Sequence, residues 1–419
     1  MKYAIASVLL LAALAFGQSW VVEQLDSTSA SGSPVELVKA ADGRLWAGYG
    51  TKTGAARVAC LGDSGWSFTD VCSSADLPWT GYRPFLAASP HGELCLACWD
   101  STARTNSLYR MVNDTWRSEP QPFSDSGPLN GVAYDSSGRL YTLLEPWTAR
   151  FVLGHETDSG WTTSEIVQLP VYGFGYYGNV GYLTAAADGS PWFFGFSGWE
   201  DGPKGDYETN LLHFSGDTWA SVWDVYGWPD LPPIPVVLVP HGDGVGNLTS
   251  HNDYIMCDSE PITGIAHWPV AGLTYSAEDV PLVAWVPSDQ AAGPFFAFRT
   301  NWWHVENIPG PAGKGGLDIE VDTSGQVVIV YSTQDNGLWC ARGMDVVGVD
   351  ESPKPQAPSR KLAATVLSGA SGVKRLASSV VFDAMGRRVA NPRSGVYFLR
   401  SASSVTRDAP SVTKVVIQR

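Results

Sequence analysis

The feature that most constrains this chain is a two-part motif that recurs seven times between residues 20 and 349. One part is a turn, usually centred on Gly, that leads into an apolar or aromatic run; the other is a run that opens on Trp. The turns fall at Asp42-Gly43, His91-Gly92, Asp135 to Gly138, Asp188-Gly189, His241-Gly242, Ala292-Gly293 and Asp322 to Gly325. The Trp positions are Trp20, Trp66, Trp116, Trp161, Trp219, Trp268 and Trp303. Short turns between alternating apolar runs predict antiparallel hairpins.

Each unit is long enough for four short strands. In the first unit we expect strands at residues 35–40, 44–49, 56–61 and 66–70. The pair Asp42-Gly43 predicts a two-residue hairpin turn, because both residue types accept a positive φ at low cost. The third and fourth strands are joined by short polar turns, such as the one that ends at Gly65.

The two ends of the repeat region complement each other. The chain begins with a fourth strand, residues 20–25, that has no preceding three, and it ends with three strands, 317–321, 326–331 and 338–342, that have no fourth. Pairing these ends would remove the one open sheet edge in the circle. Repeats of strands and tight turns with this period are typical of a β-propeller. We therefore predict an all-β fold: a seven-bladed β-propeller over residues 18–349, closed by the N-terminal strand.

The segments outside the repeats predict export and a second domain. Residues 1–17 combine a cationic Lys2, an apolar run and small residues at Ala15 and Gly17, which is the pattern of a secretory signal peptide. Cleavage after Gly17 and cleavage after Ala15 both fit. Residues 350–361 hold three Pro and predict an extended linker. Residues 362–419 then alternate strand and turn signals, so we expect a small C-terminal β-sandwich.

Charge is divided between the two parts of the chain. Residues 18–350 contain 14 Lys and Arg against 39 Asp and Glu, a net charge of −25, whereas residues 360–419 contain 11 against 2, a net of +9. An acidic propeller repels phosphate, so we expect no nucleic-acid partner. The basic residues of the C-terminal segment are spread over strands and turns, as in a solvated small domain.

Cysteine and histidine patterns argue against a metal site or a cofactor. The six Cys permit disulfides in an exported chain, and Cys60 could pair with Cys72 on a neighbouring strand. Cys95 and Cys98 lie three positions apart in an expected strand, where they would face opposite sides. His241, His251 and His267 have spacings that fit no ligand template. We therefore predict no metal and no cofactor.

Three stretches near the C-terminus carry a specific resemblance. They are Phe382-Asp-Ala-Met-Gly386-Arg-Arg-Val, Ser394-Gly-Val-Tyr-Phe and Lys414-Val-Val-Ile. In this order they resemble the type A sorting domain of the bacterial type IX secretion system. The resemblance implies a small β-sandwich that is read by an outer-membrane export machine, with release or cell-surface attachment of the propeller.

The propeller resembles the secreted repeat propellers related to sialidases, which carry Asp-box turns between the third and fourth strands. Here the same turn reads Asp63-Ser-Gly65-Trp66 or Asp158-Ser-Gly160-Trp161. The resemblance supports the fold and says little about activity. A sialidase-like enzyme would need an Arg cluster, a Tyr nucleophile with a Glu and an acidic Asp. No recognisable motif holds such residues, so the catalytic residues stay unassigned.

Aromatic and charged residues are concentrated in one set of loops. Connections from fourth to first strands and from second to third strands emerge on the same face of a propeller, around its central channel. Flat aromatic side chains beside carboxylates and Arg suit sugar faces or protein contacts. The candidate ligand-binding residues are Trp79, Tyr82, Arg83, Trp99, Arg104, Trp147, Tyr176, Trp199 and Trp228.

Two classes of function fit these observations. The first is an exported, non-catalytic recognition module: a monomeric propeller, released or displayed at the cell surface, that binds a glycan or a surface protein through the aromatic loops. The second is a glycan-active enzyme on the same scaffold, a sialidase-like hydrolase or a lyase. A structural surface protein without a small ligand is a third reading.

Overall fold

The computed structural model describes most of the repeat region and four short segments of the C-terminal part. The described residues are 20–72, 84–100, 105–119, 129–144, 150–168, 176–201, 204–215, 218–227, 234–242, 244–251, 254–258, 260–262, 270–287, 293–299, 302–335, 337–343, 365–368, 380–382, 395–400 and 412–418. The chain divides into two compact units, Met1–Gly348 and Val349–Arg419. The predicted signal peptide and linker lie outside the described residues.

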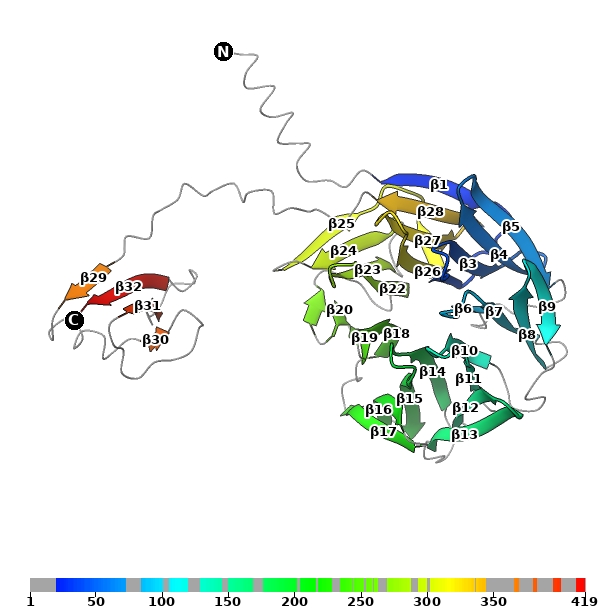
Figure 1. Ribbon diagram of the computed structural model, residues 1–419, viewed down its shortest axis with the longest axis horizontal. Coiled ribbons are helices and arrows are strands. Elements are labelled where there is room, and N and C mark those ends of the chain that lie inside the picture. Colours follow the sequence, from blue (N-terminus) through cyan, green and yellow to red (C-terminus); the bar gives the residue numbers. More distant parts are fainter. Residues whose placement is uncertain are drawn as a thin grey trace, which may run out of the picture. The chain divides into compact units, whose positions relative to one another are not determined.

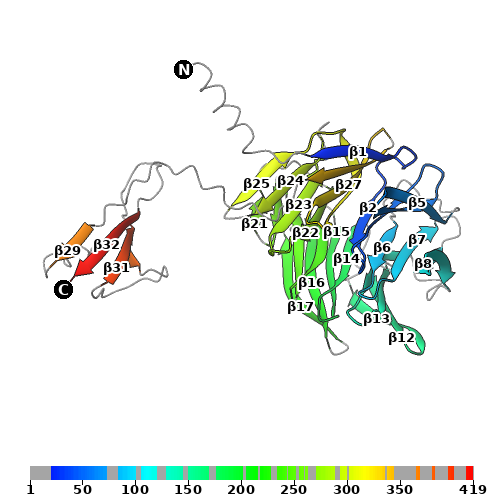
Figure 2. The same cartoon turned by 45° about the horizontal axis from the view of Figure 1, so that its top comes forward.

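The first unit is a ring of seven four-stranded antiparallel sheets (Figures 1 and 2). Blade 1 contains β2 (Val35–Lys39), β3 (Leu45–Gly50), β4 (Ala56–Gly62) and β5 (Gly65–Cys72). Blade 2 contains β6 (Phe85–Ala88), β7 (Leu94–Asp100), β8 (Thr105–Val112) and β9 (Thr115–Glu119). Blade 3 contains β10 (Leu129–Tyr134), β11 (Leu140–Leu144), β12 (Arg150–Thr157) and β13 (Gly160–Gln168).

The remaining four blades follow the same order from the axis outward. Blade 4 contains β14 (Tyr176–Ala185), β15 (Pro191–Asp201), β16 (Lys204–Ser215) and β17 (Thr218–Gly227). Blade 5 contains β18 (Ile234–His241), β19 (Gly244–His251), β20 (Tyr254–Cys257) and β21 (Glu260–Ile262). Blade 6 contains β22 (Val270–Tyr275), β23 (Pro281–Val286), β24 (Phe295–Arg299) and β25 (Trp303–Asn307). Blade 7 contains β26 (Gly313–Val321), β27 (Val327–Thr333), β28 (Leu338–Gly343) and, as its outer strand, β1 (Val21–Asp26).

The predicted closure of the ring is confirmed. Strand β1 pairs antiparallel with β28, with Val21 opposite Arg342 and Val22 opposite Ala341. The inner strands of neighbouring blades are in contact all the way round, including β2 with β26. The first strand of the repeat region therefore completes the last blade, and no blade lacks a strand.

The turn between the first and second strands of blade 1 differs from the predicted two-residue hairpin turn. The loop of blade 1 has three residues, not two: the Gly43 N–H donates to the Ala40 carbonyl (2.8 Å) and the Ala40 N–H to the Arg44 carbonyl (2.9 Å). Gly43 has a positive φ of 84°, whereas Asp42 does not. The Asp42 carboxylate instead accepts from the Arg44 N–H (3.0 Å). The geometry is a turn followed by a left-handed residue, for which Gly is favoured.

Two repeat positions were also assigned wrongly. In blade 6 the turn is not at Ala292-Gly293, since Phe295–Arg299 is the third strand β24. The turn is at Ser276–Val280, where Asp279 takes the positive φ (67°). In blade 5 the outer strand is β21, and Trp268 lies outside the described residues.

Hydrophobic clusters fill the interfaces between blades. In six of them a Trp at the start of an outer strand packs against buried side chains of the preceding blade; these are Trp20, Trp66, Trp116, Trp161, Trp219 and Trp303. The repeated Trp is therefore a packing residue. At the interface of blades 4 and 5 the described residues form a buried cluster of Phe194, Leu211 and Leu238.

The second unit contains one four-stranded sheet in the order β29-β32-β31-β30. Its strands are β29 (Thr365–Ser368), β30 (Val380–Phe382), β31 (Gly395–Arg400) and β32 (Val412–Gln418). Each of the three resemblance stretches contributes to one of the last three strands. The described residues of this unit include no strand of a second sheet. In neither unit do the described residues form a helix that could span a membrane.

Candidate functional site

The central channel contains a cavity of about 430 Å³. All seven inner strands line it, from Val35 and Glu36 on β2 round to Leu317 and Asp318 on β26. In most blades the lining residues belong to the N-terminal halves of the inner strands. The N-terminal ends of these strands meet the fourth-to-first connections, so the cavity lies toward the face with those connections. We call this face the loop face and the opposite one the turn face.

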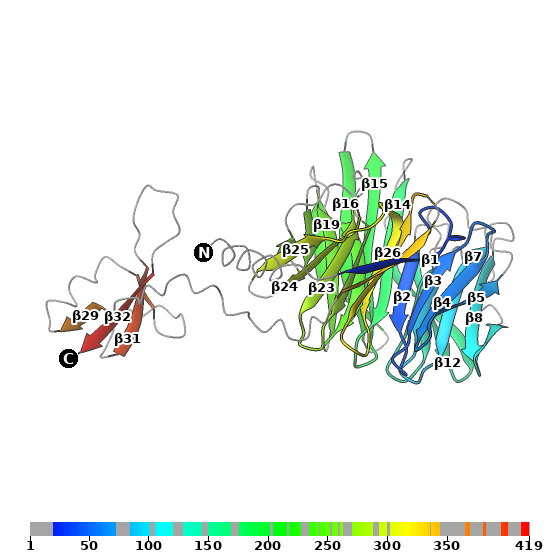
Figure 3. The ribbon, with the colours of Figure 1, turned by 90° about the horizontal axis from the view of Figure 1, so that it is seen from above.

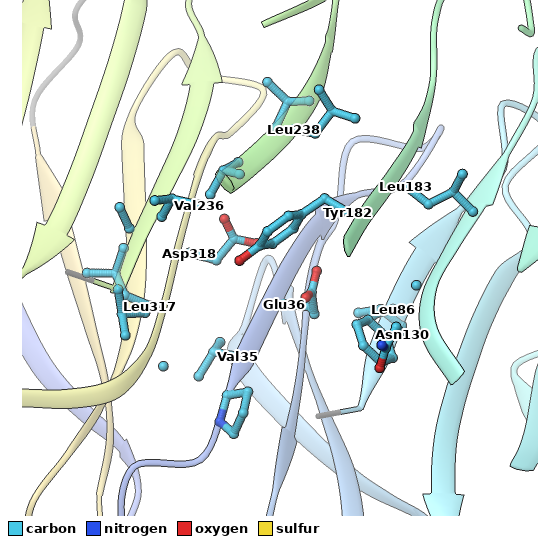
Figure 4. A pocket seen from close by; sticks show the side chains of 18 of the residues that line it. Val35, Glu36, Leu86, Asn130, Tyr182, Leu183, Val236, Leu238, Leu317 and Asp318 are labelled. Atoms are coloured by element: carbon cyan, nitrogen blue, oxygen red, sulfur yellow. The ribbon is translucent and has the colours of Figure 1, made fainter. Parts of the chain in front are cut away.

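Most of the lining residues are apolar, and four of those in the described part of the ring have polar side chains: Glu36, Asn130, Tyr182 and Asp318. Figure 4 shows the carboxyl groups of Glu36 and Asp318 and the ring of Tyr182 directed into the space between the strands. The volume lies within the range of small-molecule pockets, which are mostly apolar with a few placed polar groups. The cavity is therefore large enough for one small ligand or one ligand group.

Asp318 is held in place by two backbone donors. Its carboxylate accepts from the Leu37 N–H of blade 1 (2.7 Å) and from the Ile319 N–H of its own strand (2.8 Å). Burial raises the pKa of Asp318 well above its usual value, and repulsion from Glu36 raises it further. The Asp318 carboxyl group thus links the last blade to the first.

A second half-buried carboxyl group lies two positions further along β26. Glu320 accepts from the Val321 N–H (2.7 Å) and lies 3.4 Å from the Thr274 hydroxyl of blade 6. Burial raises the pKa of Glu320, and the nearby Lys39 opposes this rise. The Lys39 ammonium donates to the Val321 carbonyl (3.0 Å), a further link between blades 1 and 7.

Blade 4 differs from the other blades in the length of its strands. Its four strands have 10, 11, 12 and 10 residues, and β15 and β16 extend beyond the rest of the ring in Figure 3. The start of β14 and the end of β15 form the extension. There Trp199 of β15 is the cross-strand partner of Tyr176 on one side and of Asp206 on the other. First strands begin and second strands end on the loop face, so the extension stands on the same face as the cavity.

The nine predicted ligand-binding residues fall into two groups. Trp99 lies on β7, opposite Asn106 of β8, and Tyr176 and Trp199 form the pair on blade 4. The other six lie outside the described residues: Trp79, Tyr82, Arg83, Arg104, Trp147 and Trp228. The structure therefore brings together Tyr176 and Trp199, and their role in binding stays a prediction.

The channel residues were missed by the sequence analysis, although a signal for them existed. Glu36, Tyr182 and Asp318 each lie four positions before the residue that opens the turn of their blade, which is Ala40, Ala186 or Asp322. Because the three residues occupy the same position in their repeats, they lie at one level of the channel. Polar residues in otherwise apolar inner strands are the pattern that would have identified them.

The Cys residues and His241 make packing contacts inside the propeller. None of the six Cys forms a disulfide in the structure, so the predicted Cys60–Cys72 pairing is not present. Cys95 packs in the cluster between blades 2 and 3 and Cys98 in the cluster between blades 1 and 2, as expected for opposite sides of a strand. His241 stacks on Tyr275 at 3.7 Å and lies 2.7 Å from the Asp279 carboxylate. Within the described part of the chain, no group of three or more His, Cys, Asp or Glu could hold a metal ion.

Comparison with known proteins gives fold-level similarity alone. No family model and no curated protein matches the chain. Among solved structures, AofleA from Arthrobotrys oligospora is 10% identical, with 78% of this chain and 90% of that chain covered and a TM-score of 0.45. An α-L-arabinanase of Penicillium chrysogenum complexed with arabinobiose is 15% identical (79% and 98% covered, TM-score 0.44). A mutant of the Aleuria aurantia lectin in complex with α-methyl-L-fucoside is 11% identical (76% and 93% covered, TM-score 0.44). Similarity at this level gives no information about ligand or activity.

Proposed function

We propose that this propeller is a recognition module that binds a glycan through its loop face. The observation that carries the proposal is the position of the channel cavity, which lies toward the same face as the Tyr176–Trp199 pair of blade 4. A concave pocket that opens toward the same face as aromatic residues suits the faces and hydroxyl groups of a sugar.

A glycan array tests this proposal directly. We expect the full chain to retain a defined set of glycans, and Trp199→Ala or Tyr176→Ala to weaken retention about tenfold or more, as for aromatic residues at the centre of a binding interface. Trp302→Ala is the matched control, because Trp302 is 55% exposed and precedes β25 on the turn face. Retention should be unchanged in this variant.

Three results would contradict the recognition proposal. The first is an array on which no glycan is retained, and the second is equal loss in the Trp199 and Trp302 variants. The third is release of free sugar from retained glycans by the wild-type chain, which would favour the enzyme hypothesis. Reducing-sugar assays on the retained glycans measure this release.

We also propose that the module acts outside the cell and that the C-terminal unit directs its export. The resemblance of strands β30 to β32 to a type IX sorting domain and the signal-peptide pattern of residues 1–17 support this. In a host with that secretion system, removal of residues 362–419 should leave folded propeller in the periplasm. Cell fractionation measures this, and undiminished surface delivery of the shortened chain would refute the sorting role.

A further inference from the structure

Two cysteines from neighbouring blades point into the interface between blades 1 and 2. Cys72 ends β5, the outer strand of blade 1, and Cys98 lies on β7, the second strand of blade 2. Both pack in the hydrophobic cluster between these blades, where Cys98 is buried and Cys72 is half-buried. The interface therefore gathers two thiols that are 26 positions apart in the chain.

The second strands of the two blades fix the level of Cys98 in this interface. A Cβ atom on Gly48 of β3 would lie 3.4 Å from the Leu96 side chain of β7, so these two positions are opposite each other. Both strands run toward the loop face, and side chains two positions apart on a strand share a face. Gly50 and Cys98 each lie two positions further on and are therefore neighbours at the next level.

The strand pairing within blade 1 brings Cys72 to the same level. Gly50 is the cross-strand partner of Ala56, and Ala56 is the partner of Cys72. No side chain of this row larger than a methyl group separates Cys98 from Cys72. Burial raises the pKa of Tyr109 on β8 to about 12, and the nearby side chains of Cys72 and Cys98 add to this rise. Both thiols therefore lie close to the same tyrosine hydroxyl.

The other four cysteines, all within the described residues, are not placed to pair with Cys72. Cys60 faces the same interface, but it lies four positions from Ala56 on β4, which is about 13 Å along the strand. A disulfide needs Cα atoms within about 7 Å of each other. The remaining three pack in clusters at other blade interfaces: Cys95, Cys257 and Cys340. The partner that the fold offers to Cys72 is therefore Cys98 and not the Cys60 predicted from the sequence.

We propose that Cys72 and Cys98 are an oxidation site, at which a small disulfide such as oxidised glutathione converts the two thiols into a disulfide between blades 1 and 2. The modification goes beyond glycan recognition and does not depend on it. The export proposed above would bring the chain into the oxidising surroundings in which disulfides persist.

The reaction is a thiol–disulfide exchange in two steps. The half-buried Cys72 reacts first: its thiolate attacks one sulfur of oxidised glutathione, and one reduced glutathione leaves. The Cys98 sulfur then attacks the mixed disulfide on Cys72 and displaces the second glutathione. Two electrons pass from the two cysteines to oxidised glutathione, and the two thiol protons end on the released glutathione molecules.

The test is oxidation of the reduced full chain with oxidised glutathione, without denaturant, followed by non-reducing peptide mass spectrometry. We expect a 72–98 bridge within each molecule. The bridge restricts the unfolded chain, so the oxidised protein should melt about 5 °C higher than the reduced protein. Cys60→Ser, which removes a thiol from the same cluster, is the matched control and should form the same bridge. Cys98→Ser should instead keep glutathione on Cys72, because the displacing thiol is absent.

Several outcomes overturn the proposal. They are thiols at Cys72 and Cys98 that stay reduced, a glutathione adduct that persists on Cys72 of the wild-type chain, and a bridge from Cys72 to Cys60. Loss of the 72–98 bridge in Cys60→Ser would also contradict the assignment. A bridge that forms without raising the melting temperature would contradict its role in joining the two blades. Retention on the glycan array is a separate readout, so failure of either proposal is seen independently of the other.

Discussion

A chain that begins at Ser27, without β1, is expected to lose stability throughout the propeller. Deletion removes the five cross-strand pairs with β28, the ion pair of Glu23 with Arg342 and the hydrogen bond from Trp20 Nε1 to Glu306 (3.0 Å). It also removes Asp26, which accepts from the hydroxyl of the fully buried Tyr49 (2.6 Å). A buried hydroxyl without a partner costs about 1–3 kcal/mol alone.

The expected loss is about 4 kcal/mol or more, and the melting temperature should fall by about 10 °C or more in one cooperative transition. Differential scanning calorimetry measures both the midpoint and the cooperativity. Val21→Thr is the control, since Val21 is 60% exposed and its side chain contributes little burial. A shortened chain that melts at the wild-type temperature would mean that β1 is a frayed end and does not close the ring.

The second large effect is expected at Gly316, where blade 7 meets blade 1. A Cβ atom at this position would fall on the Ser33 carbonyl oxygen and lie 2.8 Å from Pro34 Cα and Val35 N. These are backbone atoms, so no side-chain rotation can make room. Gly316→Ala should therefore lower the free energy of unfolding by about 3 kcal/mol.

Gly62 is the matched control for this substitution. A Cβ atom at Gly62 would meet nothing within 4 Å, and neither Gly62 nor Gly316 has a positive φ. Gly62→Ala should change stability by less than about 0.5 kcal/mol. Urea titration of both variants measures the difference, and equal effects would show that blades 7 and 1 do not approach as closely as the structure has them.

The sequence predicted the architecture because the repeat is made of local signals. Trp at the start of outer strands and Gly in turns are fixed by packing and by backbone conformation, and both recur in phase. The prediction failed where another residue fills the same role. Asp279 takes the left-handed position in blade 6 without a Gly, and the Gly293-Pro-Phe run imitates a turn before a strand.

The candidate site was less predictable because it depends on which strand is innermost. Glu36 and Asp318 are 282 positions apart in the chain and meet only when the ring closes between blades 1 and 7. Their neighbours in the sequence are apolar strand residues that carry no motif. The extension of blade 4 was also invisible, because its strands continue into segments that contain Gly and Tyr and that we expected to be loops.

Disulfide trapping of β1 on β28 tests the central claim, the closed seven-bladed ring, most directly. Val21 and Arg342 are cross-strand partners at opposite ends of the repeat region, and adjacent antiparallel strands bring such pairs within disulfide range. With Cys at both positions, the monomeric protein should form an intramolecular 21–342 bridge under mild oxidation, identified by peptide mass spectrometry. Free thiols at both positions, or bridges formed only between molecules, would contradict the closed ring.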